Sequence, residues 1–199
     1  MTTASPSLRD ITGMYYSPAS LKDSALIMVD CQNTYRQGVM QLVNVEPAIK
    51  EAQKLLQKAR DLRIPIIHIQ HDAGVGTPFD VTAEIGAIST EVAPKNGEAV
   101  VVKNYPNSFV ATPLEAQLKA LGIENVVIAG FMTHMCINST ARGAFNLGFK
   151  PMVVASACAT RNLVGANGKV IDAQTMHDSA LAAIRDLFAV VVDEVAHLN

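Results

Sequence analysis

Short apolar runs alternate with longer segments of helical periodicity along most of this chain. The apolar runs lie at residues 25–30, 64–70, 99–103, 125–129, 150–156 and 189–192. Each run is nearly continuous and too short for a typical helix. Such runs are typical of strands whose two faces are both buried, as in a parallel sheet. The pattern therefore predicts a sheet built from these runs.

Helical periodicity fills most of the intervals between these runs. Residues 44–62 place their apolar side chains on one face of a helix, and residues 172–188 do the same. A shorter helix is predicted at residues 140–147. Thr112, with Glu115 three residues later, has the pattern of a capping box and predicts one more helix start.

The alternation of strands and helices predicts one α/β domain with a mainly parallel sheet over residues 25–199, preceded by an N-terminal extension at residues 1–24. In such sheets ligands bind at the carboxyl ends of the strands. Residues 71–98 form the longest irregular connection, so we expect a wall or lid over the site. Together with residues 31–43 and 157–170, this connection would shape the pocket.

Three reactive side chains stand at or just beyond predicted strand ends: Asp30, Lys103 and Cys136. A thiolate can attack a carbonyl carbon, and a carboxylate can take the thiol proton and return it to a leaving nitrogen. An ammonium group and a helix N-terminus lower the pKa of a cysteine from its usual value of about 8.5. We therefore expect Cys136 to be a nucleophile with a lowered pKa.

The order Asp30, Lys103, Cys136, with Gly-Phe-Met-Thr-His-Met-Cys at residues 130–136 directly after a strand, resembles the isochorismatase-like cysteine hydrolases. The resemblance covers about residues 25–192. It implies a Rossmann-like three-layer sandwich with a six-stranded, mainly parallel sheet. It also implies that Asp30, Lys103 and Cys136 form a catalytic triad.

The same resemblance implies a cis peptide bond between Phe131 and Met132. That geometry would direct the N–H groups of Met132 and Cys136 toward the oxyanion of a tetrahedral intermediate. Both N–H groups are therefore expected to form the oxyanion hole.

The predicted function is hydrolysis of a C–N bond in a small amide, ureido or lactam compound through a Cys136 thioester. One alternative is isochorismatase-type vinyl ether hydrolysis, although family members with that activity often lack the cysteine. Another is a non-hydrolytic protein on the same fold that uses a low-pKa Cys136 as a thiol sensor or binds a partner.

Further side chains near these strand ends are candidates for substrate binding: Gln32, Tyr35, His71, Phe131 and His134. For Gln32, ordinary turn capping is an equally good interpretation. Cys31 and Cys158 are interpreted as packing residues, since Cys31 should point to the opposite face of the strand from Asp30.

Nicotinamidases of the same superfamily bind a divalent metal through an Asp-x-His and a further histidine after the second strand. Here the corresponding residues 68–72 read His-Ile-Gln-His-Asp. His68 and His71 are three residues apart, so on a continuous strand they face opposite sides and cannot bind one ion. His71 with Asp72 could still form part of a site if the strand ends earlier. We predict no metal and no cofactor.

Composition narrows the class of partner. The net charge is −2 and no block of Lys or Arg exists, which argues against nucleic acid and anionic membrane surfaces. No uninterrupted apolar segment is long enough to span a membrane, and residues 1–24 lack a secretory pattern. Three cysteines, in no metal or disulfide pattern, favour the reducing cytoplasm. The expected partner is a small-molecule substrate, and the family resemblance and the apolar composition favour a homo-oligomer.

Overall fold

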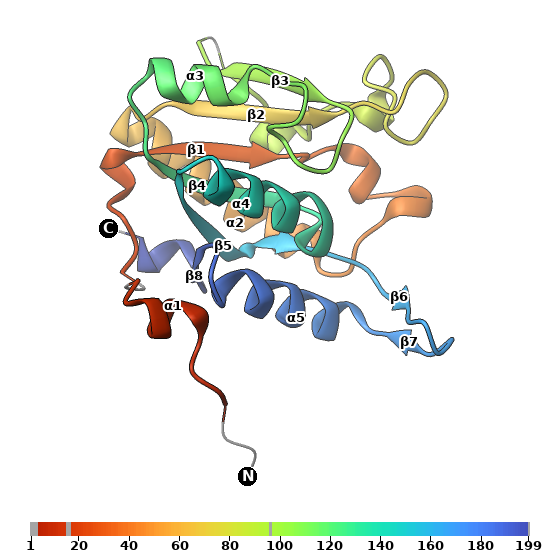
Figure 1. The fold of residues 1–199 in the computed structure, drawn as a ribbon. Coiled ribbons are helices and arrows are strands. Elements are labelled where there is room, and N and C mark those ends of the chain that lie inside the picture. The colour runs from red at the N-terminus through yellow and green to blue at the C-terminus, as the bar shows by residue number, and fades with distance from the viewer. Residues whose placement is uncertain (1–3, 15–16, 96, 199) are drawn as a thin grey trace.

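The protein contains a six-stranded parallel sheet in the order β3-β2-β1-β4-β5-β8 (Figure 1). The structure is a computed structural model that describes residues 4–14, 17–95 and 97–198. The strands are β1 Ser24–Val29, β2 Ile66–His71, β3 Ala99–Lys103, β4 Asn125–Phe131, β5 Lys150–Ala159 and β8 Val190–Val192. The predicted six-stranded parallel sheet is confirmed.

The strand order creates a crevice at the carboxyl ends of the central strands. From β1 the chain adds β2 and β3 on one side, and then returns to add β4, β5 and β8 on the other. The connections after β1 and β4 therefore leave in opposite directions. In α/β proteins this switch point, at the carboxyl ends of the strands, is where ligands bind.

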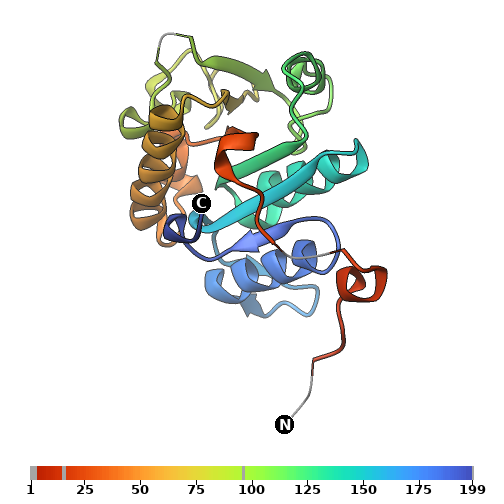
Figure 2. The same ribbon diagram turned by 90° about the vertical axis from the view of Figure 1, so that its left-hand side faces the viewer.

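Helices cover both faces of the sheet and make three layers (Figure 2). One face carries α2 Val45–Leu62, and the other carries α3 Leu114–Ala120, α4 Asn138–Asn146 and α5 Ala173–Arg185. Leu26 and Met28 pack in the cluster beside α2, whereas Ala25, Ile27 and Val29 pack in the opposite cluster. Because side chains alternate along a strand, this continuous apolar run fills both cores.

Single turns of helix complete the connections. They are η1 Leu21–Asp23, η2 Asn33–Tyr35, η3 Gly38–Met40, η4 Glu84–Gly86, η5 Thr90–Val92, η7 Val195–His197 and the π-helical turn η6 Thr133–Ile137. Between β2 and β3, the described residues 72–95 and 97–98 contain η4 and η5 and no longer helix or strand, so the predicted irregular connection is confirmed. No helix among the described residues has the length and apolar character needed to cross a membrane.

The capping box predicted at Thr112 is wrong. Helix α3 begins at Leu114, and its N-cap is Pro113, which has no side chain that could accept a hydrogen bond. The Thr112 hydroxyl instead donates to the Ser108 carbonyl at 2.6 Å, and Glu115 forms an ion pair with Lys119. The Thr112 hydroxyl also accepts the Leu114 N–H at 3.4 Å, but the reciprocal pair of bonds that defines a capping box is not formed.

Two other boundaries differ from the prediction. Strand β2 starts at Ile66 and not at residue 64, because Pro65 has no N–H for the ladder and the preceding Arg63 has a left-handed backbone with φ of 56°. Helix α4 starts at Asn138, before the predicted residue 140, because the π-helical turn η6 leads directly into it.

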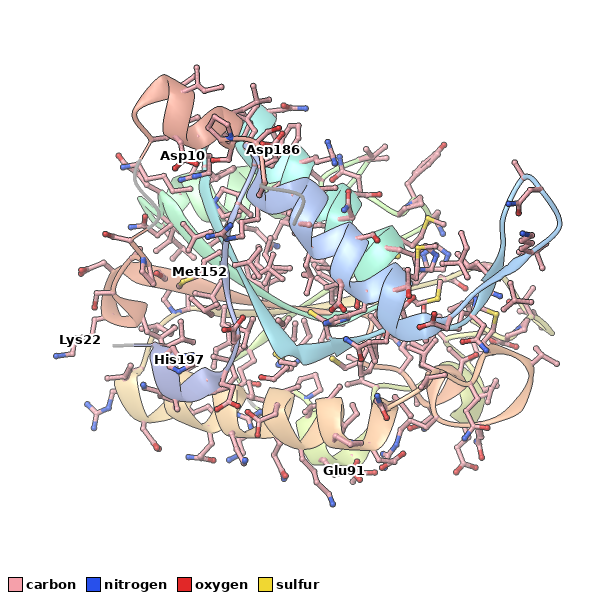
Figure 3. All side chains as sticks on the ribbon, turned by 90° about the horizontal axis from the view of Figure 1, so that it is seen from below. Asp10, Lys22, Glu91, Met152, Asp186 and His197 are labelled. Carbon is pink, nitrogen blue, oxygen red and sulfur yellow. The ribbon has the colours of Figure 1, made fainter. Side chains whose placement is uncertain are left out.

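The predicted N-terminal extension contains a short helix, α1 Leu8–Thr12, that packs against the end of α5 (Figure 3). The Leu8 N–H donates to Asp186 Oδ1 at 2.9 Å, and the Arg9 N–H donates to the Asp186 carbonyl at 2.9 Å. These bonds attach the extension to Asp186 at the C-terminal end of α5. This point of attachment lies away from the crevice beside β1 and β4 (Figure 1).

A two-stranded hairpin, β6 Leu163–Val164 and β7 Val170–Ile171, was not predicted as strands. It projects from the body of the molecule between β5 and α5 (Figures 1 and 3). Its connecting residues 165–169 form a turn, in which the Gly168 N–H donates to the Gly165 carbonyl at 2.9 Å.

Candidate active site

The three predicted catalytic side chains meet at the switch point of the sheet. Asp30 directly follows β1, Lys103 ends β3, and Cys136 lies in η6 just after β4. Lys103 Nζ lies 2.7 Å from Asp30 Oδ2 and donates a hydrogen bond to Cys136 Sγ at 3.3 Å. Exposed fractions are 0% for Asp30, 1% for Lys103 and 5% for Cys136. A cation, a carboxylate and a thiol thus share one almost solvent-free space.

Local backbone geometry turns Asp30 out of the sheet. Its φ is 50°, a left-handed conformation that Asp and Asn tolerate better than most residues. Its N–H still continues the ladder by donating to the Ile69 carbonyl at 3.0 Å. The chain therefore leaves the sheet at Asp30 with the carboxylate directed toward Lys103.

The turn that carries Cys136 is wider than an ordinary helical turn. The Ile137 N–H donates to the Met132 carbonyl at 3.2 Å, which is the five-residue spacing of a π-helix. The peptide bond between Phe131 and Met132 is cis. Gly130 precedes it with φ of 123°, and a Cβ at this position would lie 1.9 Å from the Val29 carbonyl oxygen. Only glycine therefore allows β4 to approach β1 this closely.

Burial sets the protonation of the site. It raises the pKa of Asp30, although the Lys103 ammonium opposes the shift. Burial and the Asp30 charge together raise the pKa of Cys136 to about 12, again against the effect of Lys103. The expected lowering of the Cys136 pKa is therefore wrong, because removal of water around the sulfur outweighs the nearby cation. At neutral pH the Cys136 side chain is therefore a thiol.

His71 is the fourth polar member of the site. Lys103 Nζ donates to His71 Nδ1 at 3.1 Å. Burial and the positive charge of Lys103 lower the pKa of His71 to about 4, so its imidazole is neutral at pH 7 and can accept this bond. Lys103 therefore has three partners, which hold its ammonium group between Asp30 and Cys136.

The side-chain amide of Gln32 is hydrogen-bonded to backbone groups of the protein. Gln32 Nε2 donates to the carbonyls of His71 at 3.0 Å and Gly86 at 2.7 Å, and its Oε1 accepts the His71 N–H at 2.9 Å. Gln32 is fully buried. The structure thus assigns it to positioning His71 and the irregular connection, and not to direct substrate contact.

Residues 24–194 match the model of the isochorismatase domain. This chain belongs to the isochorismatase family. It is 35% identical to the secreted isochorismatase effector Isc1 of Verticillium dahliae, with 94% of this chain and 96% of that protein covered. It is 31% identical to maleamate amidohydrolase of Pseudomonas putida, with coverage of 82% and 87%. The crystal structure of an isochorismatase from Pseudomonas putida superimposes with a TM-score of 0.94 at 34% identity, covering 98% and 100%.

Metal ligation does not fit the donor set of this isochorismatase-family site. His68 and His71 have separate partners, since His68 Nε2 lies 2.9 Å from Glu98 Oε2 and His71 Nδ1 is used by Lys103. Within residues 4–14, 17–95 and 97–198, no three His, Cys, Asp or Glu side chains converge as a metal would require.

Aromatic rings form one wall beside the site of this isochorismatase-family chain. Tyr35 lies edge-on to Phe131 and to Phe79, with ring centroids 5.7 Å and 5.6 Å apart. Phe79 also contacts the His71 ring at 5.0 Å. Because Phe79 belongs to residues 71–98, this connection does lie against the site. Tyr35 and Phe131 are fully buried, so they form the inner part of this wall.

The nucleophile turn is held by two further hydrogen bonds. His134 Nδ1 lies 2.5 Å from Thr160 Oγ1, and Thr133 Oγ1 lies 2.9 Å from His177 Nδ1. His134 thus lies within the turn, and one side of its ring is already engaged by Thr160. Sequence reasoning missed Thr133, Thr160 and His177, because nothing in the sequence shows that Thr160, just after β5, and His177, in α5, reach the turn.

The two other cysteines behave as predicted. Cys31 and Cys158 are buried free thiols, and burial raises the pKa of each. Cys31 packs in the cluster beside α2, whereas Cys136 packs in the opposite cluster. Neither cysteine is placed to act as a nucleophile.

Proposed function

We propose that this protein is a cysteine amidohydrolase that cleaves a C–N bond of a small amide, ureido or lactam compound through a Cys136 thioester. The observation that carries the proposal is the position of Lys103 Nζ, 2.7 Å from the Asp30 carboxylate and 3.3 Å from the Cys136 sulfur. The similarity to maleamate amidohydrolase supports C–N cleavage.

The first half of the reaction forms the thioester. Asp30 accepts the thiol proton while Cys136 Sγ attacks the carbonyl carbon, so no free thiolate accumulates. This coupling suits a thiol whose pKa is about 12 beside a carboxylate whose pKa is raised. The N–H groups of Met132 and Cys136 are proposed to donate to the oxyanion of the tetrahedral intermediate.

The second half releases the products. The protonated Asp30 donates its proton to the leaving nitrogen as the C–N bond breaks, and ammonia or an amine departs. Water then attacks the thioester carbon while Asp30 accepts one of its protons. The C–S bond breaks, the sulfur regains a proton and the carboxylic acid leaves. Lys103 stabilises the negative charge on Asp30 and on the sulfur throughout.

An amide panel tests this proposal. Wild-type enzyme should release ammonia or amine from at least one small amide, ureido compound or lactam. Cys136→Ala should lower that rate by roughly 10⁴-fold or more, because covalent catalysis is lost. Cys158→Ala is the matched control, since it removes an equally buried thiol and should leave the rate unchanged. Full activity in Cys136→Ala would refute the thioester.

Isochorismatase-type vinyl ether hydrolysis is the second candidate. The similarity to a secreted isochorismatase effector over 94% of this chain favours it. Vinyl ether cleavage needs a proton donor and water but no covalent nucleophile, so Cys136→Ala would leave it largely intact. Including isochorismate in the panel separates the two reactions. The thiol-sensor alternative is disfavoured, because Cys136 is only 5% exposed and its pKa is raised.

A homo-oligomer is proposed from the projecting hairpin β6 and β7. Val164 and Val170 are cross-strand neighbours on it and are 71% and 67% exposed. An isolated two-stranded hairpin is marginally stable in water, so a second copy of the chain is the proposed cover. Light scattering after size-exclusion chromatography should give more than one chain per particle, and Val164→Asp should lower that number. A monomeric wild type would refute the proposal.

A reducing compartment such as the cytoplasm is proposed from the three free thiols. One similar protein is a secreted effector, so the location needs direct measurement. Cell fractionation with an antibody would detect the protein in the cytoplasmic fraction, and recovery from the medium alone would contradict the proposal.

A further inference from the structure

A cavity of about 460 Å³ lies where the N-terminal ends of α2 and α5 meet the carboxyl end of β5. Small apolar side chains form most of its lining: Val43, Pro47, Ala48, Ala155, Ala159 and Ala173. Glu51 adds a carboxylate, and none of the described residues that line the cavity is a lysine or an arginine. Asp30, Lys103 and Cys136 do not line it, so this cavity is separate from the proposed catalytic site.

The edge of β5 is unpaired beside this cavity. Strand β8 pairs with residues 152–154 of β5, whereas β5 continues to Ala159. The Ser156 N–H donates to the Asp193 carbonyl at 2.9 Å, but no strand among the described residues pairs with this edge at residues 155–159. An unpaired strand edge of this kind can accept a strand from another chain.

The hairpin of β6 and β7 matches this cavity in its chemistry but does not fill the cavity of its own chain. It projects beyond the N-terminal end of α5 (Figure 3), and Val164 and Val170 are 71% and 67% exposed. The side chain of Lys169, next to Val170, forms no hydrogen bond or ion pair with any described residue. In the cavity, the Glu51 side chain is partly exposed, and Lys54 bonds one of its oxygens at 2.5 Å. The valines therefore suit the apolar lining, and the Lys169 charge is complementary to Glu51.

The hairpin begins and ends at the rim of the cavity. Thr160 and Ala173 both line the cavity, and they lie on either side of the segment that carries the hairpin. Hairpin and cavity thus belong to one surface patch. A two-fold axis beside such a patch places each hairpin in the cavity of the other copy, which is the self-complementary contact of a symmetric dimer.

Two residues of the cavity lining also hold the nucleophile turn. Thr160 Oγ1 lies 2.5 Å from His134 Nδ1, and His177 Nδ1 lies 2.9 Å from Thr133 Oγ1. Both Thr160 and His177 line the cavity. A group that fills the cavity therefore packs against the two side chains that fix the turn carrying Cys136.

We propose that the hairpin of a second copy of this chain occupies the cavity, lies along the free edge of β5 and, through Thr160 and His177, orders the nucleophile turn of the subunit that receives it. The inference rests on the proposed homo-oligomer and adds where the hairpin binds and what the contact does. Each subunit then gives one hairpin and receives one, so both nucleophile turns are held in the same way.

Cysteine cross-linking tests the contact itself. Val164→Cys chains and Pro47→Cys chains, each with its own tag, are co-expressed and treated with a short bismaleimide. A mixed cross-linked dimer should form, and peptide mapping should place the link between residues 164 and 47. Val75→Cys in place of Val164→Cys is the matched control, because Val75 is an 84% exposed valine in another connection, and it should give no mixed dimer. The three natural cysteines are at most 5% exposed, so wild-type chains should not cross-link.

Hydrogen exchange tests the effect on the nucleophile turn without requiring turnover. Val164→Asp places a charge against the apolar lining and should release the hairpin from the cavity. Amides of residues 131–140 should then exchange about tenfold faster or more, because local opening of the turn is less opposed. Residues 24–29 of β1 should exchange as in the wild type. Val75→Asp is the matched control and should change neither segment.

The outcomes separate this inference from the proposals on which it builds. An oligomeric wild type that gives no link between residues 164 and 47 would overturn the hairpin contact and leave the homo-oligomer standing. A monomeric wild type would overturn both. Unchanged exchange of residues 131–140 in a Val164→Asp protein that has lost its partner would overturn the effect on the nucleophile turn. Neither measurement depends on C–N cleavage, so a failed amide panel would leave the result of each intact.

Discussion

Strand β3 has a carboxylate and a cation at each end, and the two pairs differ in how well the carboxylate is satisfied. Before its first residue, Glu98 forms two bonds with Arg60 at 2.7 and 2.8 Å, and it also bonds His68 and the Lys95 N–H. At its last residue, Lys103 contacts an Asp30 carboxylate whose pocket excludes water.

The pKa values of the two carboxylates shift in opposite directions. Hydrogen bonds from Arg60 hold the pKa of Glu98 at about 2. Burial raises the pKa of Asp30 despite its lysine partner. A carboxylate that accepts hydrogen bonds at all its acceptor positions stays ionised and serves a structural role. A buried carboxylate with few hydrogen-bond donors around it accepts a proton more readily. The number of donors, and not the presence of a cation, distinguishes the proposed catalytic pair, Asp30 and Lys103, from the structural pair, Glu98 and Arg60.

The largest effect is expected from Asp30→Asn. Asparagine keeps the shape but cannot accept the thiol proton, so kcat/KM should fall by about 10³-fold. Steady-state kinetics on the best amide measures it, with circular dichroism as the check on folding. An Asp30→Asn enzyme within tenfold of wild type would show that another group is the base.

Glu98→Gln should lower stability and leave activity unchanged, the opposite of Asp30→Asn. Losing charge-assisted bonds to Arg60 should lower the free energy of unfolding by about 2 kcal/mol while kcat/KM stays within about twofold. Urea unfolding followed by fluorescence or circular dichroism measures the change. Glu124→Gln is the matched control, because Glu124 pairs with Lys150 at 2.7 Å on the open surface and should have little effect. Loss of activity in Glu98→Gln would remove the distinction between the two ends of β3.

The smallest effect is a difference in pH dependence. The active form needs an ionised Asp30, so kcat/KM should fall as pH drops through its raised pKa. Glu98 stabilises the folded state above its ordinary pKa of about 4.5, and that stability is lost as pH falls toward its folded pKa of about 2. Glu98→Gln should therefore flatten stability against pH below 4.5 and leave the kinetic limb unchanged.

His71 and His68 also titrate in this range. The lowered pKa of each means that protonation favours the unfolded chain, so both remove stability as pH falls below about 6.5. The wild-type and Glu98→Gln curves share the His71 contribution, whereas the pKa of His68 should fall further in Glu98→Gln, because Glu98 bonds His68 and opposes the lowering of its pKa. A kinetic limb that shifts in His71→Gln would assign it to the imidazole and not to Asp30.

The fold and the convergence of Asp30, Lys103 and Cys136 could be predicted because both depend on local patterns. Apolar runs fix which residues form strands, and the carboxyl ends of parallel strands converge, so Asp30, Lys103 and Cys136 had to lie near one edge. The cysteine's pKa could not be predicted the same way. It depends on how completely neighbouring segments exclude water from the sulfur, and no spacing in the sequence reports that.

Partners of polar side chains were the other part beyond prediction. Gln32 follows Asp30 and could have faced a substrate, yet its amide bonds the backbone of His71 and Gly86. Glu98 precedes a strand like many surface acids, and only the packing of α2 brings Arg60 to it. Such contacts join residues dozens of positions apart, so local periodicity carries no information about them.

The central claim is that Cys136 becomes acylated during amide hydrolysis, and intact-protein mass spectrometry tests it most directly. Enzyme mixed with a turned-over amide and quenched in acid within milliseconds should gain the mass of the acyl group, and peptide mapping should place it on Cys136. Cys158→Ala should gain the same mass, and Cys136→Ala should gain none. Steady turnover with no adduct on Cys136 at any quench time, together with an active Cys136→Ala enzyme, would contradict the account.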